Sequence, residues 1–157
     1  MSVEPTTEVR WLTPEQQGVW RAFLDVSRLL MDQMSRQLSE DSGMSLPEYE
    51  ILVALSEAPD RRLRMSELAD RVVSSRSRIT HTVGRMEDRG LVQREACIDD
   101  GRGVLCALTD AGFAVLEAAA PGHVDTVRSL MFDPLTRSDV EAVGVALDKV
   151  HEELRRR

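Results

Sequence analysis

Residues 74–92 read SSRSRITHTVGRMEDRGLV, and this stretch decides the fold. The two serines at its start are residues that cap a helix N-terminus, and Gly90 suits the left-handed residue that follows a helix end. Between them Ile79, Val83 and Met86 recur at spacings of three or four residues, which predicts a helix that buries these side chains. The other faces keep serine, threonine, histidine and arginine. The stretch therefore predicts a short helix with one apolar side and one basic, polar side.

The hydrophobic period changes after this helix. Residues 91–94 and 104–108 are predicted to form two short strands, and residues 99–103 are a turn-forming cluster of aspartate, glycine and arginine between them. Before the helix within residues 74–92 lies another short helix, with an apolar side made of Leu68, Ala69, Val72 and Val73. Two helices joined by a tight turn and followed by a β-hairpin form a winged helix-turn-helix. In that motif the second helix enters the major groove of DNA and the hairpin tip reaches the adjacent minor groove.

Two further helices are predicted on the N-terminal side. Thr13-Pro14-Glu15-Gln16 combines a capping box with proline at the first helical position, and it opens a helix of about 25 residues that ends near Gly43. Ser45-Leu46-Pro47-Glu48 repeats this pattern and opens a helix that stops before Ala58. The first nine residues are expected to be a frayed arm.

Two more helices are predicted after the hairpin. Thr109-Asp110 caps the first, and we expect Pro121-Gly122 to kink or break it. The second is capped within residues 136–139, and its apolar stripe consists of Val140, Val143, Leu147, Val150 and Leu154. One small winged-helix core cannot bury the stripes of these outer helices, so we expect them to meet a second copy of the chain.

The predicted fold is thus mainly α with a small β-hairpin wing. It divides into an N-terminal arm and dimerisation helix over residues 1–44, a winged helix-turn-helix DNA-binding domain over 45–109, and C-terminal helices of the dimerisation region over 110–157.

Charge is distributed unevenly along the chain. The 157 residues carry a formal net charge of -7. Residues 61–85 contain seven arginines against Glu67 and Asp70, a local balance of +5, so the remainder sums to -12. An acidic protein with one basic stripe centred on a candidate reading helix is what a selective nucleic-acid binder is expected to show.

Several classes of protein are disfavoured by the composition. No apolar run approaches the roughly 18 residues that span a bilayer, so no membrane association is expected. The N-terminus lacks the charged-then-apolar order of a secretory signal, and two cysteines are too few for a disulfide scaffold. We therefore expect a cytoplasmic globular protein.

The candidate DNA-binding residues follow from the predicted helix and hairpin. Short hydroxyls and forked guanidiniums beside a helix N-terminus suit phosphate oxygens and base edges. On the helix these residues are Ser75, Arg76, Ser77, Arg78, Thr80, His81 and Arg85. At the hairpin tip, Arg102 is expected to enter the minor groove, with Asp100 holding its side chain.

The chain resembles the MarR family of bacterial transcriptional regulators. The resemblance rests on Ser66-Glu67-Leu68-Ala69, on Met86-Glu87-Asp88-Arg89-Gly90-Leu91-Val92, and on Asp100-x-Arg102 followed by Leu108-Thr109-Asp110-Ala111-Gly112. It implies a homodimer held by the N- and C-terminal helices, which would present two reading helices to a near-palindromic operator. It also implies a repressor that a small phenolic or anionic effector releases from double-stranded DNA.

The residues that would hold an effector are predicted less specifically. Trp11, Trp20 and Met31 are candidates to line a ligand pocket, although aromatic residues on a dimer helix more often serve packing. His123, after Pro121-Gly122, is either structural or a pocket residue.

Alternative functions stay open at this point. Cys97 or Cys106 could make the protein a redox sensor, since Arg94 precedes Cys97 and can lower a thiol pKa; a disulfide between them depends on their distance. A dimeric protein-interaction module that no longer binds DNA is another reading. The three histidines show no metal-ligand spacing and no catalytic motif is present, so neither a metal, a cofactor nor an enzymatic activity is expected.

Overall fold

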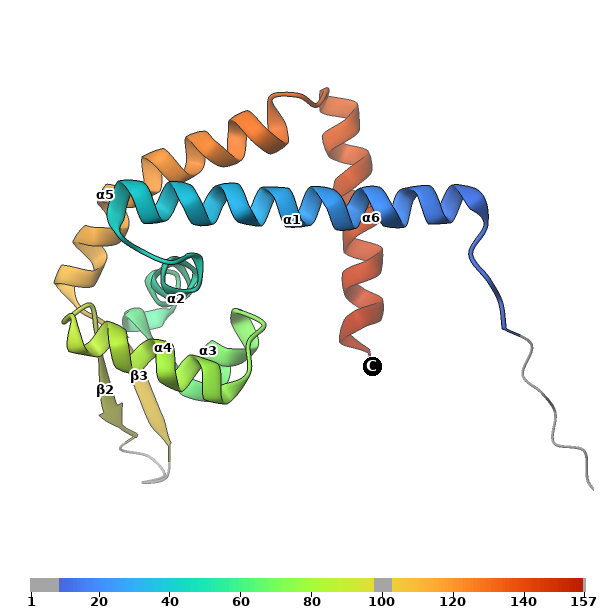
Figure 1. Ribbon diagram of the computed structural model, residues 1–157. Helices are drawn as coiled ribbons and strands as arrows, with labels where there is room; N and C mark the ends of the chain where they lie inside the picture. The colour runs from blue at the N-terminus through green and yellow to red at the C-terminus, as the bar shows by residue number, and fades with distance from the viewer. Residues whose placement is uncertain (1–8, 98–102, 157) are drawn as a thin grey trace, which may run out of the picture.

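The computed structural model describes residues 9–97 and 103–156, and in this part of the chain it is mainly helical (Figure 1). The helices are α1 (Pro14–Ser42), α2 (Leu46–Ser56), α3 (Met65–Arg71), α4 (Arg76–Asp88), α5 (Asp110–Val127) and α6 (Arg137–Arg155). The strands are β1 (Arg62–Arg64), β2 (Val92–Ala96) and β3 (Val104–Leu108). A short 3₁₀ turn, Pro59–Arg61, precedes β1, and a π-helical turn, Arg128–Phe132, follows α5. The predicted winged helix-turn-helix is confirmed, with α3 and α4 as its two helices.

The antiparallel sheet has three strands, in the order β1-β3-β2. Cys106 of β3 is paired with Leu63 on one side and with Arg94 on the other. The sequence predicted only the two-stranded hairpin. The strand β1, Arg62–Arg64, alternates over only three residues, which is too short for a periodic signal, so its pairing with β3 identifies it.

One hydrophobic core joins the helix-turn-helix to the helices before and after it. Leu38 of α1, Leu52 of α2, Leu68 of α3 and Met86 of α4 are completely buried in it, and Leu116 of α5 packs into the same cluster. The C-terminal half of α1 and the first half of α5 are therefore fixed to the DNA-binding lobe, which we define as α2 to α4 with the sheet.

The predicted helix boundaries are confirmed at most ends. Thr13 and Ser45 form the expected capping boxes, and the Ser75 side chain accepts a hydrogen bond from the start of α4. Gly43 and Gly90 both adopt left-handed φ values, +64° and +72°. The capping residues and the two glycines therefore set the ends of these helices where the sequence predicts them.

Pro121 does not end α5, which runs without a break from Asp110 to Val127. Of the two predicted outcomes, a kink or a break, the break is wrong: Figure 1 shows the helix changing direction along its length while staying helical. A proline removes one backbone donor and crowds the preceding turn, which bends a helix where packing on both sides holds it.

The first half of α1 runs out beyond the lobe (Figure 1), and both this half and α6 have large apolar side chains exposed. No residue of α6 is buried, although the helix is described along its whole length. On the first half of α1 the exposed large side chains include Val19, Trp20, Phe23 and Val26. Among the described residues, no helix is both long enough and apolar enough to cross a membrane.

Candidate nucleic-acid interface

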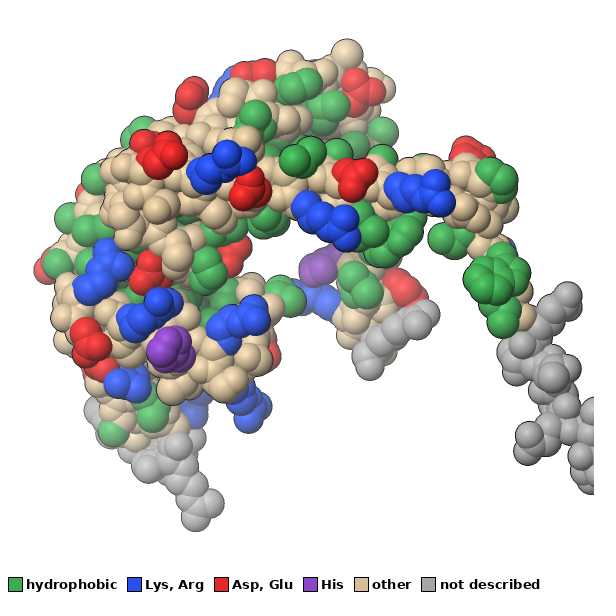
Figure 2. Space-filling model, viewed as in Figure 1, with side chains coloured by type: hydrophobic (Ala, Val, Ile, Leu, Met, Phe, Trp, Pro, Cys, Tyr) green, Lys and Arg blue, Asp and Glu red, His purple; other side chains and the backbone are tan. Residues whose placement is uncertain are grey.

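The helix α4 divides its side chains as its sequence predicts. Ile79, Val83 and Met86 are buried in the core, together with Thr82. The seven residues of α4 and its N-cap that are proposed to contact DNA are all exposed: Ser75, Arg76, Ser77, Arg78, Thr80, His81 and Arg85. Figure 2 shows basic side chains and a histidine gathered over α4 on one face of the lobe. The structure therefore brings these residues together on one exposed surface.

Three arginines on this surface have no internal partner. Within residues 9–97 and 103–156, the guanidinium groups of Arg76, Arg78 and Arg85 form no ion pair or hydrogen bond with another side chain. By contrast, Arg62 pairs with Glu95 at 3.4 Å and Arg89 pairs with Glu48 at 3.2 Å. The unpaired groups are free to bind phosphate oxygens or guanine, because no carboxylate has to be displaced first.

The hydroxyl groups at the start of α4 are partly engaged. The Ser75 Oγ accepts a hydrogen bond from the Arg78 backbone N–H at 3.3 Å and lies 3.3 Å from the Ser77 Oγ. Thr80 donates its hydroxyl hydrogen to the Arg76 carbonyl oxygen at 2.8 Å. A DNA phosphate only accepts hydrogen bonds, so it needs a donor. The Thr80 hydroxyl hydrogen is already used within the helix, and its oxygen can only accept a hydrogen bond from a base edge. A serine hydroxyl is therefore the better donor to a phosphate.

Glu87 and Arg94 connect the reading helix to the wing. The Glu87 carboxylate accepts hydrogen bonds from the Arg94 backbone N–H at 2.8 Å and from its Nε at 2.7 Å, and the Arg94 Nη2 lies 2.6 Å away. The backbone bond first, and then the guanidinium, lower the pKa of Glu87 below its ordinary value. This contact fixes the direction of β2 relative to α4. Sequence reasoning missed it, since no local pattern relates a helix residue to a strand residue seven positions later.

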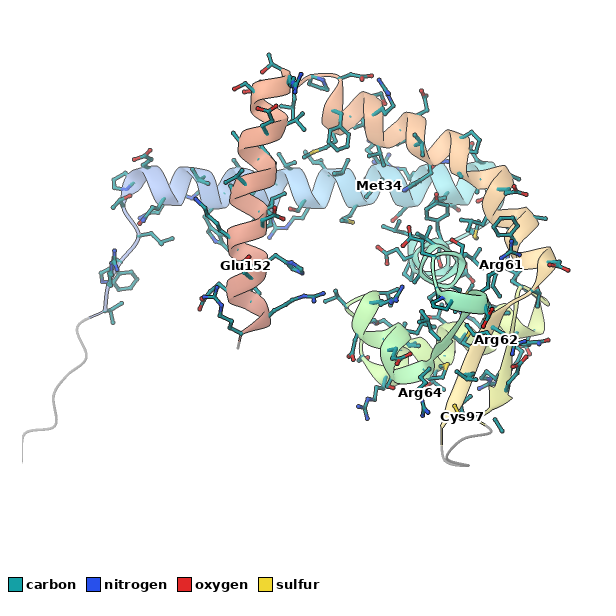
Figure 3. All side chains as sticks on the ribbon, turned by 180° about the vertical axis from the view of Figure 1, so that it is seen from behind. Met34, Arg61, Arg62, Arg64, Cys97 and Glu152 are labelled. Carbon is teal, nitrogen blue, oxygen red and sulfur yellow. The ribbon has the colours of Figure 1, made fainter. Side chains whose placement is uncertain are left out.

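The proposed wing-tip residues Asp100 and Arg102 lie outside the described residues, so their roles stay predictions. The described strands end at a hydrogen bond from the Cys97 N–H to the Gly103 carbonyl oxygen at 2.9 Å. Figure 3 shows Cys97 at this end of the wing strands, with Arg61, Arg62 and Arg64 following one another along β1 and the turn before it.

The cysteines are poorly placed for redox chemistry. Burial raises the pKa of Cys106 to about 12, and Cys97 is buried as well. The register pairs Cys106 with Arg94, and Cys97 lies three residues beyond Arg94, so the two cysteines are about 10 Å apart along the ladder. A disulfide needs Cα atoms within about 7 Å, which excludes a bond between them in this fold. The redox-sensing alternative is therefore disfavoured.

A cavity of about 550 Å³ lies between the DNA-binding lobe and the helices α1 and α5. Its walls come from α1, α2, the end of α3 and the turn after it, and α5; they include Met34, Tyr49, Glu50, Arg71 and His123. We call it the interlobe cavity. The Tyr49 and His123 rings stack obliquely there, with centroids 4.3 Å apart.

Two of the four predicted effector residues line this region. His123 lines the interlobe cavity, and Met31 lines an adjoining cavity of about 330 Å³. Trp11 is 83% exposed ahead of α1, and Trp20 is 52% exposed on its outer half, where its ring stacks on Phe23. Neither tryptophan lines these two cavities.

Sequence reasoning missed Tyr49 and Glu50, which the structure places at the interlobe cavity. Tyr49 fits the apolar stripe of its helix, and Glu50 is one more charged residue on a helix surface. No sequence signal distinguished either residue from an ordinary packing or solvent-facing position.

Comparison with known proteins gives a consistent match. The model of the MarR family matches residues 42–103. The HTH-type transcriptional repressor YetL of Bacillus subtilis is 30% identical over 110 residues, which cover 70% of this chain and 65% of YetL, slightly under two thirds of its length. The transcriptional regulator HosA of Escherichia coli is 31% identical over 101 residues, which cover 64% of this chain and 73% of HosA.

Solved structures match over almost the whole chain. Sco3205, a MarR family transcriptional regulator from Streptomyces coelicolor solved in complex with DNA, is 47% identical with a TM-score of 0.90, over 95% of this chain and 93% of that one. AbsC, a MarR family regulator from the same organism, is 41% identical with a TM-score of 0.90, over 95% of this chain and 100% of that one.

Proposed function

This chain belongs to the MarR family of transcriptional regulators, and from that premise we propose that it is a homodimeric repressor of a near-palindromic operator in double-stranded DNA. The observation that carries the proposal is the set of three internally unpaired arginines on the exposed side of α4. They sit on a chain that is otherwise acidic, so the positive potential is concentrated at the reading helix. No catalytic step is proposed.

Each candidate residue receives a role in this proposal. Arg76, Arg78 and Arg85 contact phosphates or guanines in the major groove. Ser75, Ser77, Thr80 and His81 complete the groove contacts. At the wing tip, Arg102 occupies the minor groove and Asp100 holds its side chain. The Glu87–Arg94 contact supports that wing by fixing its strands against α4.

The second subunit covers the outer helices. Most of the stability of a helix in a protein comes from packing its apolar face, and α6 buries none of its residues in the single chain. Val145, Leu147, Val150 and Leu154 are exposed on α6, as are Trp20 and Phe23 on α1. A two-fold dimer that buries these side chains presents two copies of α4 about one DNA turn apart, which requires a near-palindromic operator.

Release from DNA is proposed to follow from a small molecule in the interlobe cavity. On one side of the cavity lie α1 and α5, which are proposed to form the dimer interface. On the other side lie α2 and the turn between α3 and α4, which leads into the reading helix. A ligand that fits the cavity better in one relative position of these parts shifts the spacing of the two reading helices, because binding favours the state that it fits.

The regulator proposal is tested by DNA selection and titration. We would select duplexes from a random library with the full-length protein and titrate the enriched duplex by fluorescence anisotropy across a salt series. We expect specific binding about a thousandfold tighter than binding to random DNA, with a steep salt dependence. A protein that enriches no sequence and binds all duplexes equally weakly is a protein-interaction module, and that result overturns the proposal.

A further inference from the structure

We infer that the interlobe cavity binds a small aromatic cation, a phenolic ring that carries an ammonium group, in preference to a phenolic acid of the same size. The inference deepens the proposed function: it names the chemical class of the effector, and its effect on DNA rests on that function. The binding of the ligand to the cavity does not rest on the proposed function, because it can be measured without DNA.

The walls of the cavity suit a single aromatic ring. Its volume of about 550 Å³ falls within the range of small-molecule sites, and most of its lining is apolar. The apolar side chains are those of Met34, Leu46, Val53, Ala54, Val72 and Val73. The Tyr49 and His123 rings, 4.3 Å apart, add an aromatic surface on which a planar ligand can stack.

The charged groups on the walls favour a cation. The lining contains two carboxylates, Glu50 and Glu57, and one guanidinium, Arg71. Neither glutamate forms an ion pair or a hydrogen bond through its side chain within the described part of the chain. Both glutamates are exposed to solvent, and partial desolvation raises the pKa of Glu50 above its ordinary value. A carboxylate that loses water without gaining a partner is destabilised, and a ligand ammonium supplies the partner.

Two polar groups near the aromatic surface form no hydrogen bond with another described residue. Tyr49 is only 7% exposed, and its hydroxyl has no hydrogen-bond partner among the described residues. The Nδ1 atom of His123 is buried without a partner, and burial lowers the pKa of that imidazole, which favours its neutral form. A ligand phenol can accept a hydrogen bond from Tyr49 or donate one to a neutral imidazole nitrogen, so it matches this end of the cavity.

Glu50 also links the cavity to the reading helix. The adjoining cavity is lined by Glu50 as well, and by Arg78 of α4. A cation held at Glu50 is thus placed near the side of α4 that is proposed to bind DNA. An added positive charge by itself attracts DNA, so the ligand weakens the DNA complex by changing the position of α4 relative to α2 and not through its charge.

The test compares two probes of one shape and opposite charge. Tyramine is a phenol with a two-carbon arm that ends in an ammonium, and 3-(4-hydroxyphenyl)propionate ends the same arm in a carboxylate. Each is titrated calorimetrically into the full-length protein without DNA. We expect tyramine to bind at least about tenfold more tightly than the acid, the difference that one charged hydrogen bond supplies.

Substitutions locate the interaction. Glu50→Gln should weaken tyramine binding by about tenfold and narrow the difference between the two probes. Glu40→Gln removes the same charge from an exposed position on α1 that lines neither cavity, and should leave both affinities unchanged. Glu57→Gln provides a second cavity variant, and circular dichroism verifies that each variant is folded.

The outcomes separate the two proposals. Equal or tighter binding of the acid, absence of tyramine binding, or tyramine binding that Glu50→Gln and Glu57→Gln leave unchanged each overturns the inference. If the protein binds its selected duplex yet fails these tests, the regulator proposal stands alone. If tyramine binds as expected and no duplex is selected, the cavity inference stands and the regulator proposal fails.

Discussion

The carbonyl oxygen of Leu91 occupies the space in which a side chain at Gly112 would start: a Cβ built on Gly112 would lie 2.0 Å from that oxygen. Thr109 secures the approach. Its hydroxyl lies 2.7 Å from the Gly90 carbonyl oxygen and 3.0 Å from that of Leu91, and it accepts a hydrogen bond from the Gly112 N–H at 3.0 Å. The first turn of α5 is therefore clamped to the chain between α4 and β2, which joins the dimer helices to the reading helix.

Gly112→Ala is expected to destabilise the protein, because the new methyl group meets a backbone atom that cannot rotate away. Overpacking of this kind costs about 1–3 kcal/mol or more. The matched control is Gly84→Ala, where a Cβ has no heavy atom within 4 Å and alanine favours the helix. Urea unfolding should show a clear loss for Gly112→Ala and no loss for Gly84→Ala. Equal stability of the two variants would contradict the clamp.

The parts of the fold that the sequence predicted depend on residues close together in the chain. Thr13 and Ser45 cap their helices through side chains within three residues, and Gly43 and Gly90 end them through their own φ values. The close approach of Gly112 to Leu91 joins positions 21 residues apart. Its one trace in the sequence is the glycine itself, which does not reveal its partner. Such tertiary contacts, like the pairing of β1 with β3, exist only once the core has formed.

The candidate site also has a part that local sequence signals predict and a part that depends on tertiary contacts. The exposed face of α4 was predictable because a helix with Ile79, Val83 and Met86 buried must present its remaining residues to solvent. The interlobe cavity was not, because Glu50 and His123 reach it from helices 73 residues apart. Periodicity assigns a residue to one side of its own helix, and it carries no information about which other helix lies opposite.

Glu87→Gln is expected to lower the free energy of unfolding, and to lower it most at neutral pH. The pKa of Glu87 is lowered from 4.5 in the folded state, so the unfolded chain binds more protons as the pH falls. The stabilisation is complete above about pH 4.5 and is lost as the pH falls through the folded-state pKa. Both side chains are about one-third exposed, so the contribution is about 1 kcal/mol.

The measurement is urea unfolding of wild type and Glu87→Gln at several pH values between about 3 and 7. The difference between the two proteins should be largest at neutral pH and shrink toward pH 3. Glu40→Gln, which removes a charge from an exposed site on α1, controls for net charge. A constant difference at every pH would mean that the ion pair with Arg94 is not its source.

Neither cysteine is expected to react in the folded protein. Burial holds Cys106 as a thiol because its pKa is about 12, and Cys97 is also buried. A thiol reagent at about pH 8 should label both residues in denaturant and neither in native buffer, and peroxide should leave the affinity for the selected duplex unchanged. Peroxide-dependent release that Cys97→Ser abolishes would restore the redox-sensing alternative.

Leu147→Glu is expected to dissociate the dimer. Leu147 is exposed on α6 in the single chain, and a carboxylate at a buried apolar interface loses water without a partner. Light scattering should give a monomer mass, with loss of binding to the selected duplex. Asp148→Ala changes the neighbouring residue on the same helix and should remain a dimer. A dimeric Leu147→Glu variant would exclude this side of α6 from the interface.

Arg78→Ala distinguishes base reading from phosphate contact near the start of α4. The Arg78 guanidinium is exposed, lacks an internal partner within residues 9–97 and 103–156, and follows the capped start of the helix by two residues. If it reads a base, its loss should cost about 1–3 kcal/mol on the selected duplex and little on random DNA. If it binds a phosphate, affinity should fall for all duplexes and the salt slope should decrease by about 1. Arg137→Ala, which removes a positive charge paired with Glu141 at 3.0 Å on α6, should change neither affinity. Full affinity and an unchanged salt slope in Arg78→Ala would place the reading surface elsewhere on the molecule.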